Sequence, residues 1–259
     1  MVADNGKVQI QRDVCIDLFD KLAPPPALRV ALGLMHAQEL IGTWRYNPVA
    51  GPPPAFFEET AVIRARVSPG RTNDNRMFHA ALPWLEDHRT LFDEIDLLQG
   101  GQYIRWRASP ELFERMAERI HSYALLDFEI IRSLRSDAQH AAYLLTQVHI
   151  RKLRPKFEIR INPEVWRTQR QAFLRAFERL APLMNAEFHV ASCFAKDRPV
   201  LERLVIKAVT ETTKWAPKAL KKFPPNRGFV IIAPGGKRIK QRTLAEIEAI
   251  DAGRVLPPP

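Results

Sequence analysis

One predicted helix, residues 163–184, carries the side-chain types that read DNA bases. Arginine can form paired hydrogen bonds with guanine in the major groove, and glutamine can do so with adenine. We predict base contacts from three residues within about one turn, Arg167, Arg170 and Gln171, with Thr168 and Arg175 extending the polar surface. The alternative is a solvated helix face that covers a core formed by apolar residues such as Phe173 and Phe177.

A β-hairpin is predicted directly after this helix. Residues 186–194 and 200–209 are strand-like, and a short charged connection joins them. A helix followed by such a hairpin is the arrangement that winged-helix proteins use in the DNA groove. Arg198 in the connection is placed to reach a neighbouring phosphate or the minor groove, with Lys196 assisting. A charged hairpin tip that serves only solubility is the alternative.

Two basic runs flank these elements and lack a fixed recognition geometry. They suit contacts with the phosphate backbone better than base reading. We assign five residues to phosphates, Lys152, Arg154, Lys237, Arg238 and Lys240, and Arg151 belongs to the first run.

Net charge is divided unevenly along the chain. The total is +10, but residues 151–259 contain 23 Lys or Arg and 10 Asp or Glu, which gives +13, whereas residues 1–150 contain 16 and 19, which gives −3. A basic block of this size favours a polyanionic partner, because each neutralised phosphate releases counterions. A basic surface without a partner is the alternative reading.

The elements that must position these residues mix helices and strands, so we expect an α+β fold. The first half is predicted to contain helices over 8–22, 27–41 and 88–98, a hairpin of 60–67 with 77–82, and a strand over 102–107. Further helices are predicted from Ser109-Pro110 to about 121 and from Ser136-Asp137 onward. The second half adds strands over 156–161 and 228–233 and a helix over 244–250.

Other chemistry finds little support in the sequence. Cys15 and Cys193 are far apart, and Pro234–Arg238 lacks the spacing of a phosphate-binding loop. The histidines show no metal-binding spacing, so we expect no enzyme activity, cofactor or metal site. Without an apolar stretch of about 20 residues or a secretory signal, we expect no membrane contact and a cytoplasmic location.

From Tyr103 onward the sequence resembles plasmid replication initiator proteins of the tandem winged-helix type. The resemblance is carried by YIRWRASPELFERM, YALLDFEIIRSLRSDAQHAAYLLTQ, FLRAFERLAPLMNAEFHV and RPVLERLVIKAV. In the second stretch the spacing of Leu134, Ser136 and Tyr143-Leu144-Leu145 is similar to the first winged helix of that family, and Arg198 is similar to an arginine in the second hairpin. The segment before the predicted recognition helix is shorter than in the family.

The resemblance implies two winged-helix domains in tandem, each with helices and a small antiparallel β-hairpin. We expect a helical region with a proline-rich linker over 1–58, domains over 59–152 and 153–254, and a disordered tail over 255–259. The implied function is recognition of repeated sites in double-stranded DNA at a plasmid origin, with host replication proteins as partners and a homodimer formed through the first domain.

Two other functions remain open at this stage. A transcriptional regulator or plasmid partition factor would share the basic helix and hairpin. An RNA- or DNA-processing enzyme would use the basic half to hold its substrate, and it would need a pocket with convergent polar groups.

Overall fold

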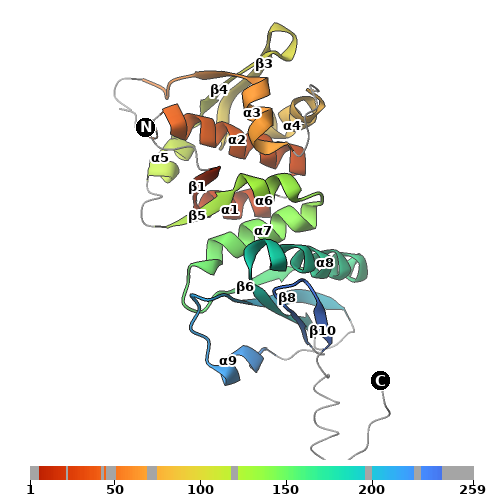
Figure 1. The fold of residues 1–259 in the computed structure, drawn as a ribbon. Helices are drawn as coiled ribbons and strands as arrows, with labels where there is room; N and C mark the ends of the chain where they lie inside the picture. The colour runs from red at the N-terminus through yellow and green to blue at the C-terminus, as the bar shows by residue number, and fades with distance from the viewer. Residues whose placement is uncertain are drawn as a thin grey trace, which may run out of the picture. The chain divides into compact units, whose positions relative to one another are not determined.

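A computed structural model describes the protein. It covers residues 6–21, 23–41, 44, 51–68, 75–117, 122–195, 200–224 and 229–240, with Lys240 as backbone only. The chain forms two compact units, residues 1–148 and 149–259, which both combine helices with antiparallel sheets (Figure 1). The α+β prediction is confirmed. Every described helix is too short or too polar to span a bilayer.

Unit 1 contains most of the helices. They are α1 (Arg12–Asp20), α2 (Pro25–Ile41), α3 (Thr60–Val67), α4 (Arg76–Asp87), α5 (Pro110–Ala117), α6 (Phe128–Ser133) and α7 (Asp137–Ile150), whose last two residues belong to unit 2. A three-stranded sheet has the order β2-β4-β3, with β2 at Phe56–Glu59, β3 at Phe92–Leu98 and β4 at Tyr103–Ala108. A separate pair joins β1 (Lys7–Gln11) to β5 (Tyr123–Asp127).

The N-terminal 58 residues are part of unit 1 rather than a separate helical region. Strand β1 pairs with β5, and β2 pairs with β4, so both ends of this segment are built into sheets. The helix predicted over 8–22 is therefore wrong in its first turn. Val8 and Ile10 are buried and alternate as in a strand, and Gln11 then caps α1 by accepting from the amides of Asp13 and Val14.

Helix α3 replaces the strand predicted over 60–67. The β-branched residues of this segment favour a strand locally, but Ile63 and Val67, four residues apart, are buried together against α2. A Cβ atom on Gly33 would lie 2.9 Å from the Ile63 Cγ2 atom and 3.0 Å from the Val67 Cγ1 atom. Close packing on Gly33 thus outweighs local propensity.

The expected return strand 77–82 and the helix 88–98 are also wrong. Residues 77–82 lie in α4, where Phe78, Ala81 and Leu85 are buried on one face. Residues 92–98 form β3, which pairs with β4. Gly100 and Gly101 have φ values of 65° and 88° and turn the chain between β3 and β4.

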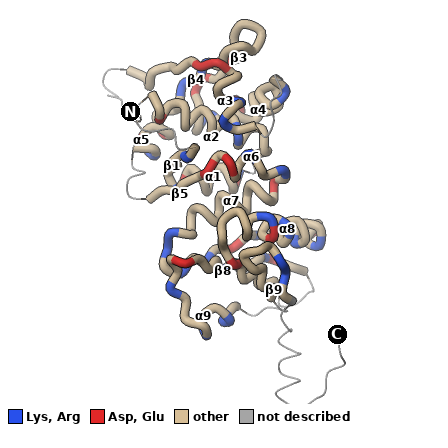
Figure 2. The backbone as a smooth tube through the Cα atoms, in the orientation of Figure 1, with Lys and Arg blue, Asp and Glu red and all other residues tan. Residues whose placement is uncertain are grey.

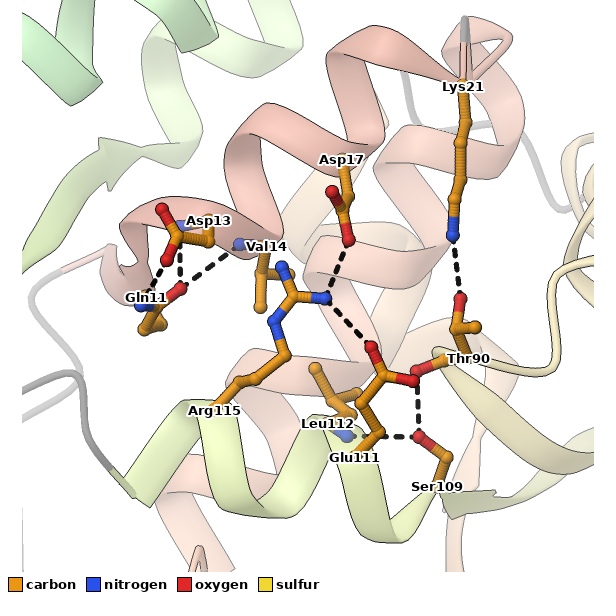
Figure 3. A network of polar contacts seen from close by, with 10 residues as sticks. All are labelled: Gln11, Asp13, Val14, Asp17, Lys21, Thr90, Ser109, Glu111, Leu112 and Arg115. Atoms are coloured by element: carbon orange, nitrogen blue, oxygen red, sulfur yellow. Dashed lines mark hydrogen bonds and ion pairs between the residues drawn. The ribbon is translucent and has the colours of Figure 1, made fainter.

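Helix α5 begins as predicted, because Ser109 accepts from the Leu112 amide at 3.0 Å and donates to the Thr90 carbonyl at 2.7 Å. Figure 3 shows how α5 is tied to α1: an Arg115 Nη1 atom lies 2.6 Å from an Asp17 oxygen and 3.3 Å from a Glu111 oxygen. These contacts fix the helices around β1 and β5. The helix predicted from Ser136 is confirmed as α7.

Unit 2 is built on a five-stranded antiparallel sheet of order β10-β9-β7-β8-β6. Its strands are β6 (Lys156–Arg160), β7 (Glu187–Phe194), β8 (Leu201–Val209), β9 (Phe229–Ile232) and β10 (Arg238–Lys240). Its helices are α8 (Trp166–Met184) and the short α9 (Pro217–Lys221). The predicted hairpin and the strands over 156–161 and 228–233 are confirmed, whereas 244–250 and 255–259 lie outside the described residues.

The two faces of this sheet are covered by different segments. Phe177 of α8 packs at a tilt against Phe157 of β6 and Phe188 of β7, so α8 covers the first face. On the second face Phe223, which follows α9, packs with Phe229 against a small buried cluster of β7 and β8. Figure 1 shows α8 and α9 on opposite sides of the sheet.

Candidate nucleic-acid interface

Helix α8 presents an exposed face without acidic residues. Phe173, Leu174, Phe177 and Leu180 point toward the sheet, and the exposed side holds the polar residues at helical spacing. The exposed polar residues of α8 are Arg167, Thr168, Gln171, Arg175 and Arg179. Glu178 is the single acid of this helix, and it is half-buried and paired. The exposed side of α8 therefore combines arginines with the neutral Thr168 and Gln171, and Figure 2 shows the basic positions along this helix.

Helix α8 starts at Trp166, three residues later than predicted. The Asn162 side chain accepts from the Glu164 amide at 3.0 Å, which closes a turn ahead of the helix instead of capping it. Trp166 packs edge-on against Phe194 of β7, and the Arg167 guanidinium lies 5.3 Å from the Trp166 ring centre. The first turn of α8 and the end of the hairpin are thus held together.

Arg170 does not share the outer side of α8 with Gln171. Its Nε atom donates to the Ser192 hydroxyl of β7 at 2.9 Å, and its side chain is half-buried. Burial, and next the nearby Arg238, lower the pKa of the Arg170 guanidinium. The prediction grouped Arg170 with Arg167 and Gln171 by their closeness in sequence. Arg170, however, precedes Phe173 by three residues and Leu174 by four, so it lies on the same side of the helix as these buried residues.

The turn between β9 and β10 lies against α8. Gly236 has a φ of 79°, and a Cβ atom there would meet the Glu178 carbonyl oxygen at 2.6 Å and the Pro182 Cδ atom at 3.5 Å. Arg238 Nε reaches a Glu178 carboxylate oxygen at 2.6 Å. Lys237 is exposed beside this contact. The second predicted phosphate-binding run therefore borders α8, with Arg238 engaged by Glu178.

The remaining predicted residues are less closely linked to α8. Arg151, Lys152 and Arg154 are exposed after α7, and Arg154 Nε donates to the Lys214 carbonyl at 3.3 Å. The hairpin tip with Lys196 and Arg198 and the side chain of Lys240 lie outside the described residues.

A second basic group lies on the other face of the sheet and was not assigned from the sequence. It comprises the exposed residues Lys214, Lys218, Lys221 and Lys222, around α9. Their segment is rich in lysine and proline. Composition alone could not place it against the sheet.

Lys207 of β8 holds this segment in place. Its ammonium donates to the backbone carbonyls of Ala219, Leu220 and Lys222, and it lies 4.0 Å from the Phe223 ring centre. Burial, and next Lys156, lower the pKa of Lys207 to about 8. A lysine inside the apolar run LVIKAV was the sequence signal for a buried cation.

Unit 1 also contains a helix followed by a hairpin, α4 with β3 and β4, but its charges are balanced locally. Arg105 lies 2.8 Å from Asp96, and Arg107 lies 3.2 Å from Glu94, across the hairpin. These arginines are therefore compensated by strand neighbours.

Within the described ranges, no three His, Cys, Asp or Glu side chains gather as metal ligands would. Cys15 and Cys193 are both buried as free thiols. Burial raises the pKa of each thiol, which disfavours the reactive thiolate. Comparisons with family models, with curated proteins and with solved structures found no match to this chain.

Proposed function

We propose that the protein binds double-stranded DNA sequence-specifically through α8 of unit 2. The observation that carries the proposal is the outer side of α8, where three exposed arginines and Gln171 stand without an exposed acid. An exposed helix fits into the major groove of DNA. There an arginine side chain can hydrogen-bond to guanine, and a glutamine side chain can hydrogen-bond to adenine. Arg167, Gln171 and Arg175 are the base-contact candidates on this side.

The β9–β10 turn supplies backbone contacts in this proposal. Lys237 is exposed next to α8, because Gly236 packs against Glu178 and Pro182. A phosphate contact beside a base-reading helix sets the register of the protein on the duplex. Arg151, Lys152 and Arg154 contribute further positive charge to the same unit. Arg198 of the hairpin tip remains our candidate for the wing contact.

The order of elements supports a winged-helix assignment for both units. The order of elements in unit 1 is α2, β2, α3, α4, β3 and β4, and strand β2 pairs with β4. Unit 2 has the same order of elements in β6, α8, β7 and β8, except that a turn replaces the helix between β6 and α8. Strand β6 pairs with β8. Strands β9 and β10 then extend this sheet. This succession of helices and a hairpin suits groove binding.

Within this class we propose a replication initiator that recognises repeated sites at a plasmid origin, acting without enzyme activity and with host replication proteins. The proposal rests on the resemblance of residues 103–209. A transcriptional regulator or partition factor shares the same interface. Duplex opening distinguishes the initiator, because a regulator binds its site without exposing single-stranded bases.

The test is binding of the full chain to duplex DNA from upstream of its own gene and to random duplex of equal length, across a salt series. We expect selective binding that persists at moderate salt. Permanganate reactivity of thymines next to the bound site then tests duplex opening. Equal binding to both duplexes that vanishes with salt would leave only a nonspecific basic surface.

A further inference from the structure

A polar pocket of about 320 Å³ lies in unit 1 and takes no part in the proposed function. It is formed where three segments meet: the start of α3 at Thr60 and Ala61, the start of α4 at Asn75, and the β3–β4 turn at Gly101. Arg64 of α3 also lines it. Its size is at the lower end of the range for small-ligand sites.

Arg64 is a buried cation without a described counter-charge. Its residue is 9% exposed, and its Nη1 atom donates to the Asn75 Oδ1 atom at 3.1 Å, a neutral partner. Within the described part of the chain, no carboxylate pairs with it, although Glu59 is exposed at the pocket rim. Burying a guanidinium without an anion is unfavourable, because the charge loses hydration that a neutral partner replaces only in part. An anion in the pocket would supply the missing charge.

Two helices begin at this pocket, and neither has a side-chain cap. Glu59 precedes α3 without capping it, and Asn75 precedes α4 without capping it. The Asn75 side chain instead accepts from Arg64 and donates to the Gly101 carbonyl at 2.8 Å. The amides of the first helical turns carry partial positive charge and favour an anion near them.

The β3–β4 turn fixes this arrangement. Gly101 has a φ of 88°, and a Cβ atom there would lie 2.4 Å from the Asn75 Nδ2 atom. The Thr60 hydroxyl donates to the same Gly101 carbonyl at 2.7 Å. Thr60 and Asn75 therefore both donate to the Gly101 carbonyl oxygen, and Asn75 links Arg64 to this turn.

We propose that this pocket binds a phosphate group through Arg64 and the first-turn amides of α3 that follow Thr60, whose own amide donates to the Gln102 carbonyl at 2.9 Å. A guanidinium presents two parallel N–H donors to an oxyanion. A carboxylate would use both of its oxygens to accept from the two guanidinium N–H groups. A phosphate has further oxygens that can accept from the helix amides. The phosphate comes either from a small molecule, such as a nucleotide, or from a DNA backbone.

The experiment titrates inorganic phosphate into the full chain at constant ionic strength, with sodium chloride as the balance. Binding is followed by calorimetry and by the unfolding temperature of unit 1. The variant is Arg64→Met, which keeps an unbranched side chain and removes the charge. The matched control is Arg135→Met, because Arg135 is an exposed arginine of unit 1 outside the pocket.

We expect saturable phosphate binding by the wild-type chain and by Arg135→Met, and at least a tenfold loss of affinity in Arg64→Met. Arg64→Lys should be intermediate, since it keeps the charge without the fork. Absence of saturable binding to the wild-type chain, or equal binding by Arg64→Met, overturns the proposal. If Arg64→Met does not fold, the ³¹P resonance of phosphate is measured with the wild-type chain. Saturable broadening supports the proposal, and absence of broadening overturns it.

Two further arms distinguish the sources of the phosphate. A nucleoside monophosphate that binds more tightly than inorganic phosphate, with DNA binding by Arg64→Met unchanged, assigns a small-molecule ligand. Competition between phosphate and random duplex, with a salt slope lower by about 1 in Arg64→Met, assigns a DNA phosphate. The phosphate titration itself contains no DNA, so its result is independent of the proposed function of α8.

Discussion

The helix–hairpin pair α4 with β3 and β4 in unit 1 and the pair α8 with β7 and β8 in unit 2 follow the same element order but differ in their charges. In unit 1, Arg105 and Arg107 are paired with Asp96 and Glu94 on the same hairpin. In unit 2, the one acid of α8 is engaged by Arg238 from another strand. The exposed arginines of α8 are therefore left available for an external anion.

This difference shows that element order alone does not identify a DNA-reading helix. The decisive property is whether the cations on its outer side are already compensated. Figure 2 shows the contrast, with acidic segments at β3 and basic segments along α8. We therefore propose unit 2, and not the helix–hairpin pair of unit 1, as the polyanion-binding part of the chain.

The largest expected effect is on DNA affinity. The double variant Arg175→Ala/Arg179→Ala should weaken binding to the specific duplex by about 3 kcal/mol, roughly 100-fold, since each arginine contact contributes about 1–3 kcal/mol. Arg76→Ala/Arg89→Ala in unit 1 removes the same charge from exposed positions and should change affinity less than about threefold. Equal losses measured by fluorescence anisotropy would show that the two units do not differ in this role.

The two units should also respond differently to pH. Burial, and next Arg29, lower the pKa of His140 in unit 1 to about 4, so the unfolded state binds more protons between pH 4 and 6.5. The contribution of this neutral histidine is complete above pH 6.5 and is lost as the pH falls toward 4. A shift of this size corresponds to about 3 kcal/mol. His140→Gln should flatten the acid dependence of the unfolding free energy of unit 1.

Lys207 gives unit 2 a dependence of the same sign in a more alkaline range. Because its pKa is lowered from 10.5 to about 8, the cost of holding it charged in the fold is fully present below pH 8. The stability of unit 2 should therefore rise between pH 8 and 10.5, which denaturant titrations can measure. Lys207→Met should abolish this rise while also loosening α9, whose carbonyls lose their donor. An unchanged alkaline slope in that variant would exclude Lys207 as its origin.

Gly236→Ala tests how closely the β9–β10 turn lies against α8. The new Cβ atom would meet the Glu178 carbonyl at 2.6 Å in a left-handed backbone conformation, so unit 2 should lose about 1–3 kcal/mol of stability. Gly235→Ala is the control, because a Cβ atom there has no neighbour within 4 Å. Similar unfolding temperatures for both variants would contradict the packing.

The smallest effects separate base contacts from backbone contacts. Lys237→Ala should weaken binding to specific and random duplexes alike and lower the salt slope by about 1. Arg170→Ala should leave sequence preference unchanged and reduce the stability of unit 2, because Arg170 bonds to Ser192. Relaxed sequence preference in Arg170→Ala would restore its predicted role as a base reader.

Unit 2 was predicted more accurately from the sequence than unit 1. In unit 2, Phe157 and Ile159 alternate with the period of a strand, and the apolar residues of α8 are spaced with the period of a helix. The local pattern therefore agrees with the burial in the fold. In unit 1 the β-branched run 60–67 favours a strand, but contact with Gly33 makes it a helix. Leu91, Ile95 and Leu98 have helical spacing by coincidence, and the pairing of β3 with β4 decides their structure.

The candidate site was predicted in part. The sequence predicted α8 and the β7–β8 hairpin as elements, because the apolar period is visible along the chain, whereas their role in DNA binding stays a prediction. The sequence did not show that Arg170 points toward β7, because its hydrogen bond to Ser192 depends on how closely α8 packs against that strand. The group around α9 and the pocket around Arg64 depend on contacts between distant segments, which no local pattern encodes.

The pairing of β1 with β5 has a consequence for biosynthesis. Residues 7–11 have their sheet partners at 123–127, so the N-terminal strand must wait for more than a hundred residues before its ladder can form. Val8 and Ile10 are apolar and stay without their strand partners on the nascent chain during that interval. The hairpin β7–β8 closes over a few residues and can form as soon as it leaves the ribosome exit tunnel.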